Sequence, residues 1–279
     1  MALVDSAGAI HGEILRIDVG QDPLADLLDA LSYFSDSYIG IGVGSPGYIS
    51  KDRTQVQYAA NLDWRNLPLP ALIQGSVGKP TVLLGDAHAA AYAEAKIGLG
   101  RGHDSLVMLT LGTGVGMSVI ANGEPLFGGR GLAGNIGHIQ IDTEEVPCPC
   151  GLTHCWEYYA GGRGLERLFD AQLKVSAKDI FELAGNFDAQ ALGAIARWSE
   201  KLAVGIALVI ELIDPEIVVL GGGISHAANL FVNELHAALV PLTPGARESG
   251  LPPIATATAG PDAGIIGAAM FAAKEIQEL

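Results

Sequence analysis

Short apolar runs that end in glycine alternate along this chain with segments in which apolar residues recur at helical spacing. Apolar runs bounded by turn residues predict buried strands, and the helical period predicts amphipathic helices. The expected strands cover residues 38–43, 80–84, 106–111, 117–121 and 217–220, and the expected helices cover 87–96, 188–212 and 264–276. Residues 44–47 are expected to form a turn, followed by a loop to about residue 69. Strands that alternate with helices in this way indicate an α/β fold.

The composition refines this fold class. Hydrophobic residues make up 49% of the 279 residues but aromatic residues only 6%, so the interior must consist mostly of Ala, Val, Leu and Ile. That mixture is typical of parallel sheets covered by helices. The length is sufficient for two domains that share a cleft. We expect a small domain over 1–100 plus 264–279 and a larger one over 101–263.

The charge excludes some function classes. The chain has 31 acidic and 16 basic residues, a net charge of −15, and no cluster of Lys and Arg that could neutralise nucleic-acid phosphates. Binding to DNA by this chain alone is therefore not expected. The N-terminus lacks the pattern of a secretory signal, and the apolar run at 202–210 ends at Glu211, too short for a membrane helix. We expect a soluble, cytoplasmic protein.

All three cysteines of the chain, Cys148, Cys150 and Cys155, follow His138 within a short segment. Three thiolates and one imidazole form the soft, four-ligand set that closes a tetrahedral shell around Zn²⁺, so a structural zinc site is predicted. His154 is an alternative fourth ligand. Two further interpretations remain open at this point: the cysteines are small buried apolar residues, or two of them form a disulfide that leaves the third unpaired.

Two glycine loops each follow an apolar strand. Backbone N–H groups in such loops can surround phosphate oxygens. Each loop taken alone favours a structural turn over a phosphate site, because conformational freedom is the commonest use of glycine. Together, with one threonine hydroxyl, they favour a nucleotide site. The candidate residues are Gly112, Thr113, Gly114 and Gly116 in the first loop and Gly221, Gly222 and Gly223 in the second.

Two carboxylates are candidate site residues. Asp86 lies between a predicted strand and a predicted helix, where the ligand crevice of an α/β fold opens, and could act as a general base. It could instead cap the helix, a role that Asp also favours. Glu157 directly follows the metal motif, and a metal-fixed turn is a rigid support for a ligand-binding carboxylate. Its alternative is an ordinary solvated glutamate.

The order of these motifs closely resembles the ROK family of sugar kinases and sugar-responsive repressors. The match extends from about Ala2 to the end of the chain, and the zinc motif is its most specific part. The matching segments are Gly44-Ser-Pro-Gly47, Asn61-Leu-x-Trp64, Gly85-Asp86-Ala, Leu111-Gly-Thr-Gly-Val-Gly116, Gly134-x-x-Gly137-His138, Cys148-x-Cys150-Gly-x3-Cys155-x-Glu157 and Val219-Leu-Gly-Gly-Gly223-Ile-Ser225.

The resemblance implies an actin-like (ribonuclease-H-like) two-domain ATPase fold with ATP and sugar in the cleft. It implies Asp86 as catalytic base, the first glycine loop at the phosphates, the second at adenosine, and Mg²⁺ with the ATP. His138 is implied both as a zinc ligand and as a sugar-binding residue. A homodimer is common in the family. The implied substrate-binding positions are Gly47, Asn61, Asp86, Asn135, His138 and Glu157.

The chain departs from the family pattern in three places. No Asp-x-Gly-Gly-Thr loop precedes Met1-Ala-Leu-Val, which resembles the second strand of family kinases, so roughly fifteen to twenty residues are expected to be missing and ATP turnover near background is expected. Gly85 replaces the usual Asn before the catalytic Asp, and His88 stands where a further Asn often lies. Asn135 replaces a glutamate, which removes a charged acceptor for a sugar hydroxyl and predicts an altered sugar preference.

Three functions compete on these grounds. The first is ATP-dependent phosphorylation of a hexose or N-acetylhexosamine, as in a glucokinase or an N-acetylmannosamine kinase. The second is a non-catalytic sugar-sensing domain of a ROK-type transcriptional repressor, which the changes at Gly85 and Asn135 suit. The third, a zinc-stabilised structural protein, leaves Asp86 and the glycine loops unexplained.

Overall fold

The structure is a computed structural model that describes residues 1–34, 38–141, 146–148, 150–170, 172 and 174–278. The chain divides into two compact units. Unit 1 consists of Met1–Gly102, Ser118–Ala133 and Thr258–Leu279, and unit 2 of His103–Met117 and Gly134–Ala257. Residues 118–133 thus cluster with unit 1, whereas the boundaries expected from the sequence assigned them to the larger domain.

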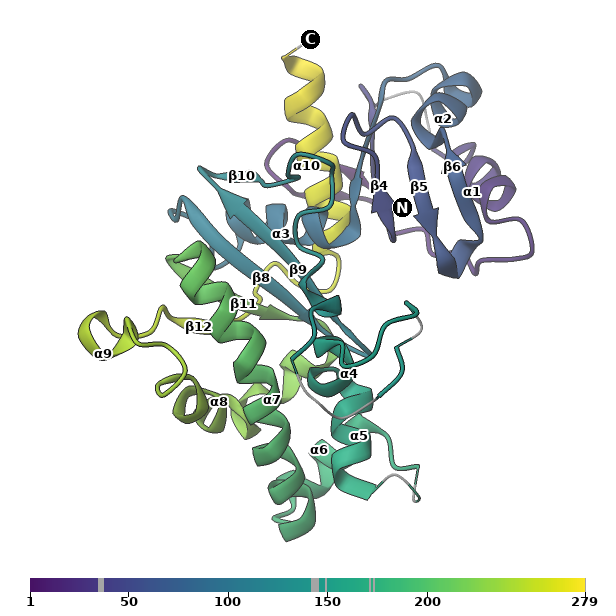
Figure 1. The fold of residues 1–279 in the computed structure, drawn as a ribbon. Coiled ribbons are helices and arrows are strands. Elements are labelled where there is room, and N and C mark those ends of the chain that lie inside the picture. Colours follow the sequence, from purple (N-terminus) through teal and green to yellow (C-terminus); the bar gives the residue numbers. More distant parts are fainter. Residues whose placement is uncertain (35–37, 142–145, 149, 171, 173, 279) are drawn as a thin grey trace. The chain divides into compact units, whose positions relative to one another are not determined.

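Unit 1 combines short strands with helices (Figure 1). Its elements are β1 (Leu3–Val4), β2 (Ile10–His11), α1 (Pro23–Leu31), β3 (Ile41–Ser45), β4 (Tyr48–Ile49), β5 (Val56–Ala59), the 3-10 helix η1 (Ala60–Leu62), β6 (Trp64–Leu67), α2 (Leu69–Val77), β7 (Thr81–Gly85), α3 (Asp86–Ile97), β10 (Glu124–Pro125) and α10 (Ala263–Gln277).

The expectation of a loop from residue 48 to about 69 was wrong. Strands β4, β5 and β6 form a three-stranded antiparallel sheet there. Val56 and Ala59 are buried and pack with Leu69 and Ile73 of α2, while the residues between them on β5 are partly or fully exposed. Strands of two to four residues carry too few alternating positions for the sequence pattern to reveal them.

Strands β3 and β7 pair in parallel, and β7 leads directly into α3. Helix α10 packs along α3, as Figure 1 shows for the yellow C-terminal helix. The two helices approach closely because Gly267 has no side chain: an added Cβ there would overlap the backbone of Ala89. This packing fixes the start of α3, where Asp86 lies.

Unit 2 combines three parallel strands with helices. Its elements are β8 (Ser105–Leu111), η2 (Ile136–His138), α4 (Trp156–Ala160), α5 (Gly162–Asp170), α6 (Ala177–Gly185), α7 (Ala189–Ile213), β11 (Ile217–Gly221), η3 (Gly223–Leu230), α8 (Val232–Leu239), α9 (Ala246–Ser249) and β12 (Ile254–Thr256). With β9 (Val115–Ala121) and β10, the strands form a sheet in the order β10-β9-β8-β11-β12, in which β8, β11 and β12 are parallel. No helix in the described ranges is long and apolar enough to cross a membrane.

Trp156 anchors α4 in the core of unit 2. Its side chain is fully buried, and its indole N–H donates to the carbonyl of Lys201 at 2.9 Å. Helix α7 approaches the ring at Gly205, where an added Cβ would overlap the indole. The contact therefore requires glycine at this position.

Substitution of Gly205 by alanine is expected to lower the free energy of unfolding by about 1–3 kcal/mol, because the new methyl group overpacks the core. Gly193→Ala, on the same helix, meets only the end of the Arg197 side chain at 3.5 Å. This control should raise stability by roughly 0.5–1 kcal/mol through helix propensity. Urea unfolding measures both, and equal effects of the two substitutions would contradict the packing argument.

Candidate functional site

The two glycine loops lie side by side at the carboxyl ends of adjacent parallel strands. Gly221 at the end of β11 is in register with Thr110 of β8, next to the first loop. Gly222 has φ +81°, and a Cβ there would overlap the backbone of Leu111. At Gly112 and Gly223, by contrast, a Cβ would meet no heavy atom within 4 Å, so the space beside these backbones is open. The pair of loops can therefore admit a group that approaches the backbone closely, as a phosphate does.

Glu157 lies against the first loop rather than in solvent. It sits in the first turn of α4, and its side chain is 24% exposed. A Cβ at Gly114 would lie 2.5 Å from Oε2 of Glu157, and a Cβ at Gly137 would lie 3.4 Å from its Cβ. Glycine at position 114 thus makes room for the carboxylate, whereas at Gly137 the overlap would be with the carbonyl oxygen of Val115, at 2.7 Å. The alternative of an ordinary solvated glutamate does not describe this environment.

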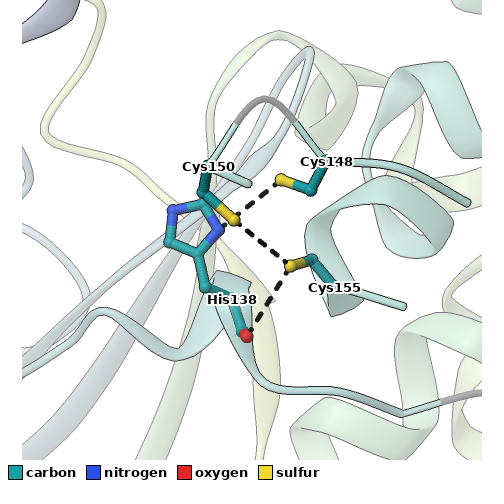
Figure 2. Close-up of side chains that lie close together, drawn as sticks. All are labelled: His138, Cys148, Cys150 and Cys155. Carbon is teal, nitrogen blue, oxygen red and sulfur yellow. Dashed lines mark hydrogen bonds between the residues drawn. The ribbon is translucent and has the colours of Figure 1, made fainter. Parts of the chain in front are cut away.

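His138, Cys148, Cys150 and Cys155 form one cluster within unit 2 (Figure 2). Their ligand atoms all lie within 4.8 Å of one another. The Sγ atoms of Cys150 and Cys155 are 3.6 Å apart, and Sγ of Cys148 is 3.8 Å from Nδ1 of His138. Ligands of a tetrahedral Zn²⁺ with bonds of about 2.3 Å are separated by roughly 3.8 Å, so the spacing and the donor set both fit zinc.

The geometry decides between the alternatives left open by the sequence. The three cysteines are free thiols, so the disulfide interpretation is not supported. Within the described residues His138, and not His154, belongs to the cluster. Oε1 of Glu157 is 3.3 Å from Nδ1 of His138 and 3.5 Å from Sγ of Cys148. The carboxylate thus borders both the metal cluster and the glycine loop.

Asp86 is the first residue of α3, at the carboxyl end of β7. The N-cap of this helix is Gly85, which makes no side-chain cap bond, so the capping role for Asp86 is not observed. Its Oδ1 accepts a hydrogen bond from the adjacent N–H of Ala87 at 2.7 Å. The residue is solvent-accessible, yet surrounding protein removes enough water to raise the pKa of the carboxyl, against smaller lowering effects of the Ala87 N–H and the nearby His88. A raised pKa is typical of a carboxylate placed for proton transfer.

His88 lies near Asp86, and in the sequence it stood out only as a difference from the family pattern. Its ring packs on Phe127 with centroids 5.1 Å apart, and burial lowers its pKa, which favours the neutral imidazole. Its Nε2 is buried without a hydrogen-bond partner among the described residues. Because His88 and Phe127 are far apart in the chain, the local sequence gives no sign that these two rings are in contact.

The remaining predicted positions occupy exposed turns. Gly47 has φ +88°, and an added Cβ would overlap the backbone of Tyr58, so a conformational need explains this glycine. Asn61 lies in η1 and Asn135 precedes η2, both exposed. Within unit 2 the structure therefore brings together the glycine loops, Glu157 and His138, while Gly47, Asn61 and Asp86 belong to unit 1.

Comparison with known proteins gives consistent matches. The ROK family profile matches residues 19–275. The glucokinase of Halalkalibacterium halodurans is 35% identical over 252 residues, which are 82% of this chain and 74% of that protein. A ROK family glucokinase from Streptomyces griseus, solved with glucose and AMPPNP, superposes with a TM-score of 0.83 at 29% identity and covers 98% of this chain and 95% of its own.

A regulator is also structurally similar. The ROK family transcriptional regulator homologous to the E. coli MLC protein has a TM-score of 0.86 at 25% identity, and the match covers 99% of this chain and 75% of the regulator. The expected actin-like, ribonuclease-H-like α/β fold is thus confirmed.

Proposed function

This chain belongs to the ROK family, and on that basis we propose that it transfers a phosphoryl group from ATP to a hydroxyl of a hexose or N-acetylhexosamine. The observation that carries the proposal is Asp86, a carboxylate at a strand end that caps no helix and has a raised pKa. The similarity to glucokinases supports the substrate class. A structural zinc protein without ligand, the third function considered, explains none of these features.

In this proposal Asp86 accepts the proton of the attacking sugar hydroxyl. The first glycine loop, Gly112 to Gly116, binds the phosphates through backbone N–H groups, and Gly221 to Gly223 bind the adenosine side. Phosphoryl transfer depends mainly on positioning and on neutralisation of charge, and a bound Mg²⁺ would supply part of that neutralisation.

On the sugar side we propose Glu157, His138 and Asn135 of unit 2 and Asn61 and Gly47 of unit 1 as binding residues, with Asp86 at the reacting hydroxyl. Glu157 is an acceptor for sugar hydroxyls. The three cysteines and His138 would hold Zn²⁺, which would stabilise the turn that presents Glu157. We further propose that two copies form a homodimer, which sedimentation of the purified chain tests.

The proposal is tested by incubation of the purified chain with γ-labelled ATP and Mg²⁺ and a panel of hexoses and N-acetylhexosamines. Labelled sugar phosphate should form with at least one sugar, above the level without protein and above that of Asp86→Asn. Calorimetric titration of the same sugars runs in parallel. A sugar that binds without any phosphate transfer contradicts the kinase proposal.

That outcome would instead favour a second candidate, a sugar-sensing domain of a transcriptional regulator. The match to the regulator structure and the presence of Gly85 and Asn135 at sugar-side positions support this candidate. Binding depends on fewer precisely placed groups than catalysis, so it survives such changes more readily.

Asn135→Glu tests the sugar-side assignment. A charge-assisted hydrogen bond is about twice as strong as a neutral one, so the affinity for the bound sugar should rise by roughly fivefold. Asn135→Gln, which has the same length without the charge, should change the affinity by less than the Glu variant. Both are measured by calorimetric titration, and identical affinities of the two variants would place residue 135 outside the sugar site.

A further inference from the structure

Helices α4 and α5 are joined by a single residue, Gly161, and α5 begins at Gly162 (Figure 1). The N–H of Gly161 donates to the carbonyl of Glu157 at 2.8 Å, and the N–H of Gly162 donates to the carbonyl of Gly112 at 2.8 Å. The carbonyl of Gly161, which also accepts the first bonds of α5, accepts from the indole N–H of Trp198 at 3.2 Å. This Gly161–Gly162 dipeptide is therefore bonded to the helix that presents Glu157, to the first glycine loop and to the core of unit 2.

The space around Gly161 admits no side chain. Its backbone is extended, with φ −79° and ψ 177°, a conformation that any residue can adopt. An added Cβ would nevertheless lie 2.5 Å from the carbonyl oxygen of Thr113, 2.7 Å from that of Glu157 and 2.8 Å from Cα of Gly114. Each of these atoms belongs to the backbone, which cannot rotate away as the end of a side chain can. An alanine at this position would therefore displace the first glycine loop and the first turn of α4.

Trp198 holds the dipeptide from the core. Its side chain is fully buried, and its ring packs edge-to-face on Phe181 and Phe231, with centroids 6.0 Å and 5.1 Å apart. Side chains in such a close-packed core keep one rotamer, so the indole N–H stays directed at the carbonyl of Gly161. This support is separate from the metal cluster, which includes none of these residues.

We propose that the Gly161–Gly162 dipeptide positions the first glycine loop and Glu157 relative to each other, so that the phosphates of ATP and the sugar bind in a fixed arrangement. The inference rests on the proposed function, in which the loop binds the phosphates and Glu157 binds the sugar. Phosphoryl transfer depends on positioning, and a displacement of about 1 Å can lower a rate by about 10²-fold. Gly161 is a positioning residue, because it acts through the loop and Glu157 and contacts neither ligand.

Gly161→Ala tests the proposal, by calorimetric titration with the panel of sugars and with AMPPNP. The dissociation constants of the bound sugar and of AMPPNP should both rise by roughly tenfold, because the new methyl group displaces both binding elements. Gly185→Ala is the matched control at the end of α6, where an added Cβ meets no heavy atom within 4 Å, and it should change neither constant. A rise for only one of the two ligands, or for neither, overturns the proposal.

A second control separates positioning from a general loss of stability. Leu239→Ala removes part of a fully buried side chain on α8 and should lower Tm at least as much as Gly161→Ala does. Both affinities should stay close to those of the unchanged chain, and a joint loss equal to that of Gly161→Ala would overturn the proposal. If Gly161→Ala does not fold, Gly162→Ala takes its place. Its Cβ would lie 3.2 Å from the carbonyl oxygen of Gly112, so a smaller joint rise is expected, and its absence has the same meaning.

Amide hydrogen exchange, resolved by NMR, tests the link without any ligand. The amide of Gly162 is bonded to Gly112, and that of Gly112 to the carbonyl of Gly114 at 3.0 Å. Gly161→Ala should speed exchange at Gly162 and Gly112 by roughly tenfold or more, and Gly185→Ala should leave it unchanged. Equal exchange in Gly161→Ala and the unchanged chain overturns the proposal. A chain that binds neither sugar nor AMPPNP contradicts the proposed function, while the exchange rates still decide whether the dipeptide holds the loop.

Discussion

Replacement of Asp86 by asparagine is expected to lower the rate of sugar phosphorylation by about 10²–10⁴-fold, the usual contribution of a general base. Asparagine keeps the size and the hydrogen bond from Ala87 but cannot accept the proton of the attacking hydroxyl. Transfer of labelled phosphate from γ-labelled ATP to the sugar measures the rate for both proteins.

Sugar affinity provides the control for this substitution. Because we propose that Asp86 also borders the reacting hydroxyl, calorimetric titration should show a change of only a few-fold, much smaller than the loss in rate. Full activity in Asp86→Asn would show that another group accepts the proton.

The pH dependence of sugar phosphorylation is also expected to reflect Asp86. A base acts in its deprotonated form, and loss of hydration raises the pKa of Asp86. On acidification, kcat/KM should therefore begin to fall at a higher pH than it would for a fully hydrated aspartate. This acidic limb should disappear in whatever residual activity Asp86→Asn retains.

Loss of a metal ligand is expected to lower both the stability of the chain and its affinity for sugar. Cys148→Ser removes one of the four candidate ligands, and structural zinc contributes many kcal/mol to the folded state of small domains. We expect less than stoichiometric zinc by elemental analysis and a Tm lower by roughly 10 °C. Sugar affinity should fall by roughly tenfold, equal to about 1.4 kcal/mol, because Glu157 loses its rigid support.

His154→Asn is the matched control for the metal prediction. His154 lies beside Cys155 but outside the metal cluster, and asparagine tolerates its positive φ of 63°. Zinc content, Tm and sugar affinity should stay close to those of the unchanged chain. A Cys148→Ser protein that lacks zinc yet binds sugar normally would separate the metal from the sugar site.

The sequence predicted elements whose signals are local. The alanine-rich helix after Asp86, the strand before Gly221 and the long helix ending near Asp214 all lie close to their expected ranges. The metal ligands could be predicted because cysteine spacing carries the chemistry of the site. In each case the residues that determine the structure are near one another in the chain.

What could not be predicted depends on contacts between distant residues. Gly205 has no local reason to be glycine and makes sense only beside Trp156. The strands β4 to β6 are stabilised by packing against Leu69 and Ile73 of α2. Their own alternation of apolar and polar residues is too short to predict a sheet. The raised pKa of Asp86 likewise depends on burial of its carboxyl in the folded chain, which the local sequence does not reveal.

Trp156 has a consequence for how this protein can be studied. It lies between Cys155, a ligand of the metal cluster, and Glu157, and its buried indole is one of three in the chain. Movement of the cysteine turn would alter the polarity around the ring and shift its intrinsic emission. Trp64 and Trp198 adjoin no cysteine in the sequence, so we expect removal of a bound metal to change the emission of Trp156 most, which fluorescence of the chain with and without a chelator would measure.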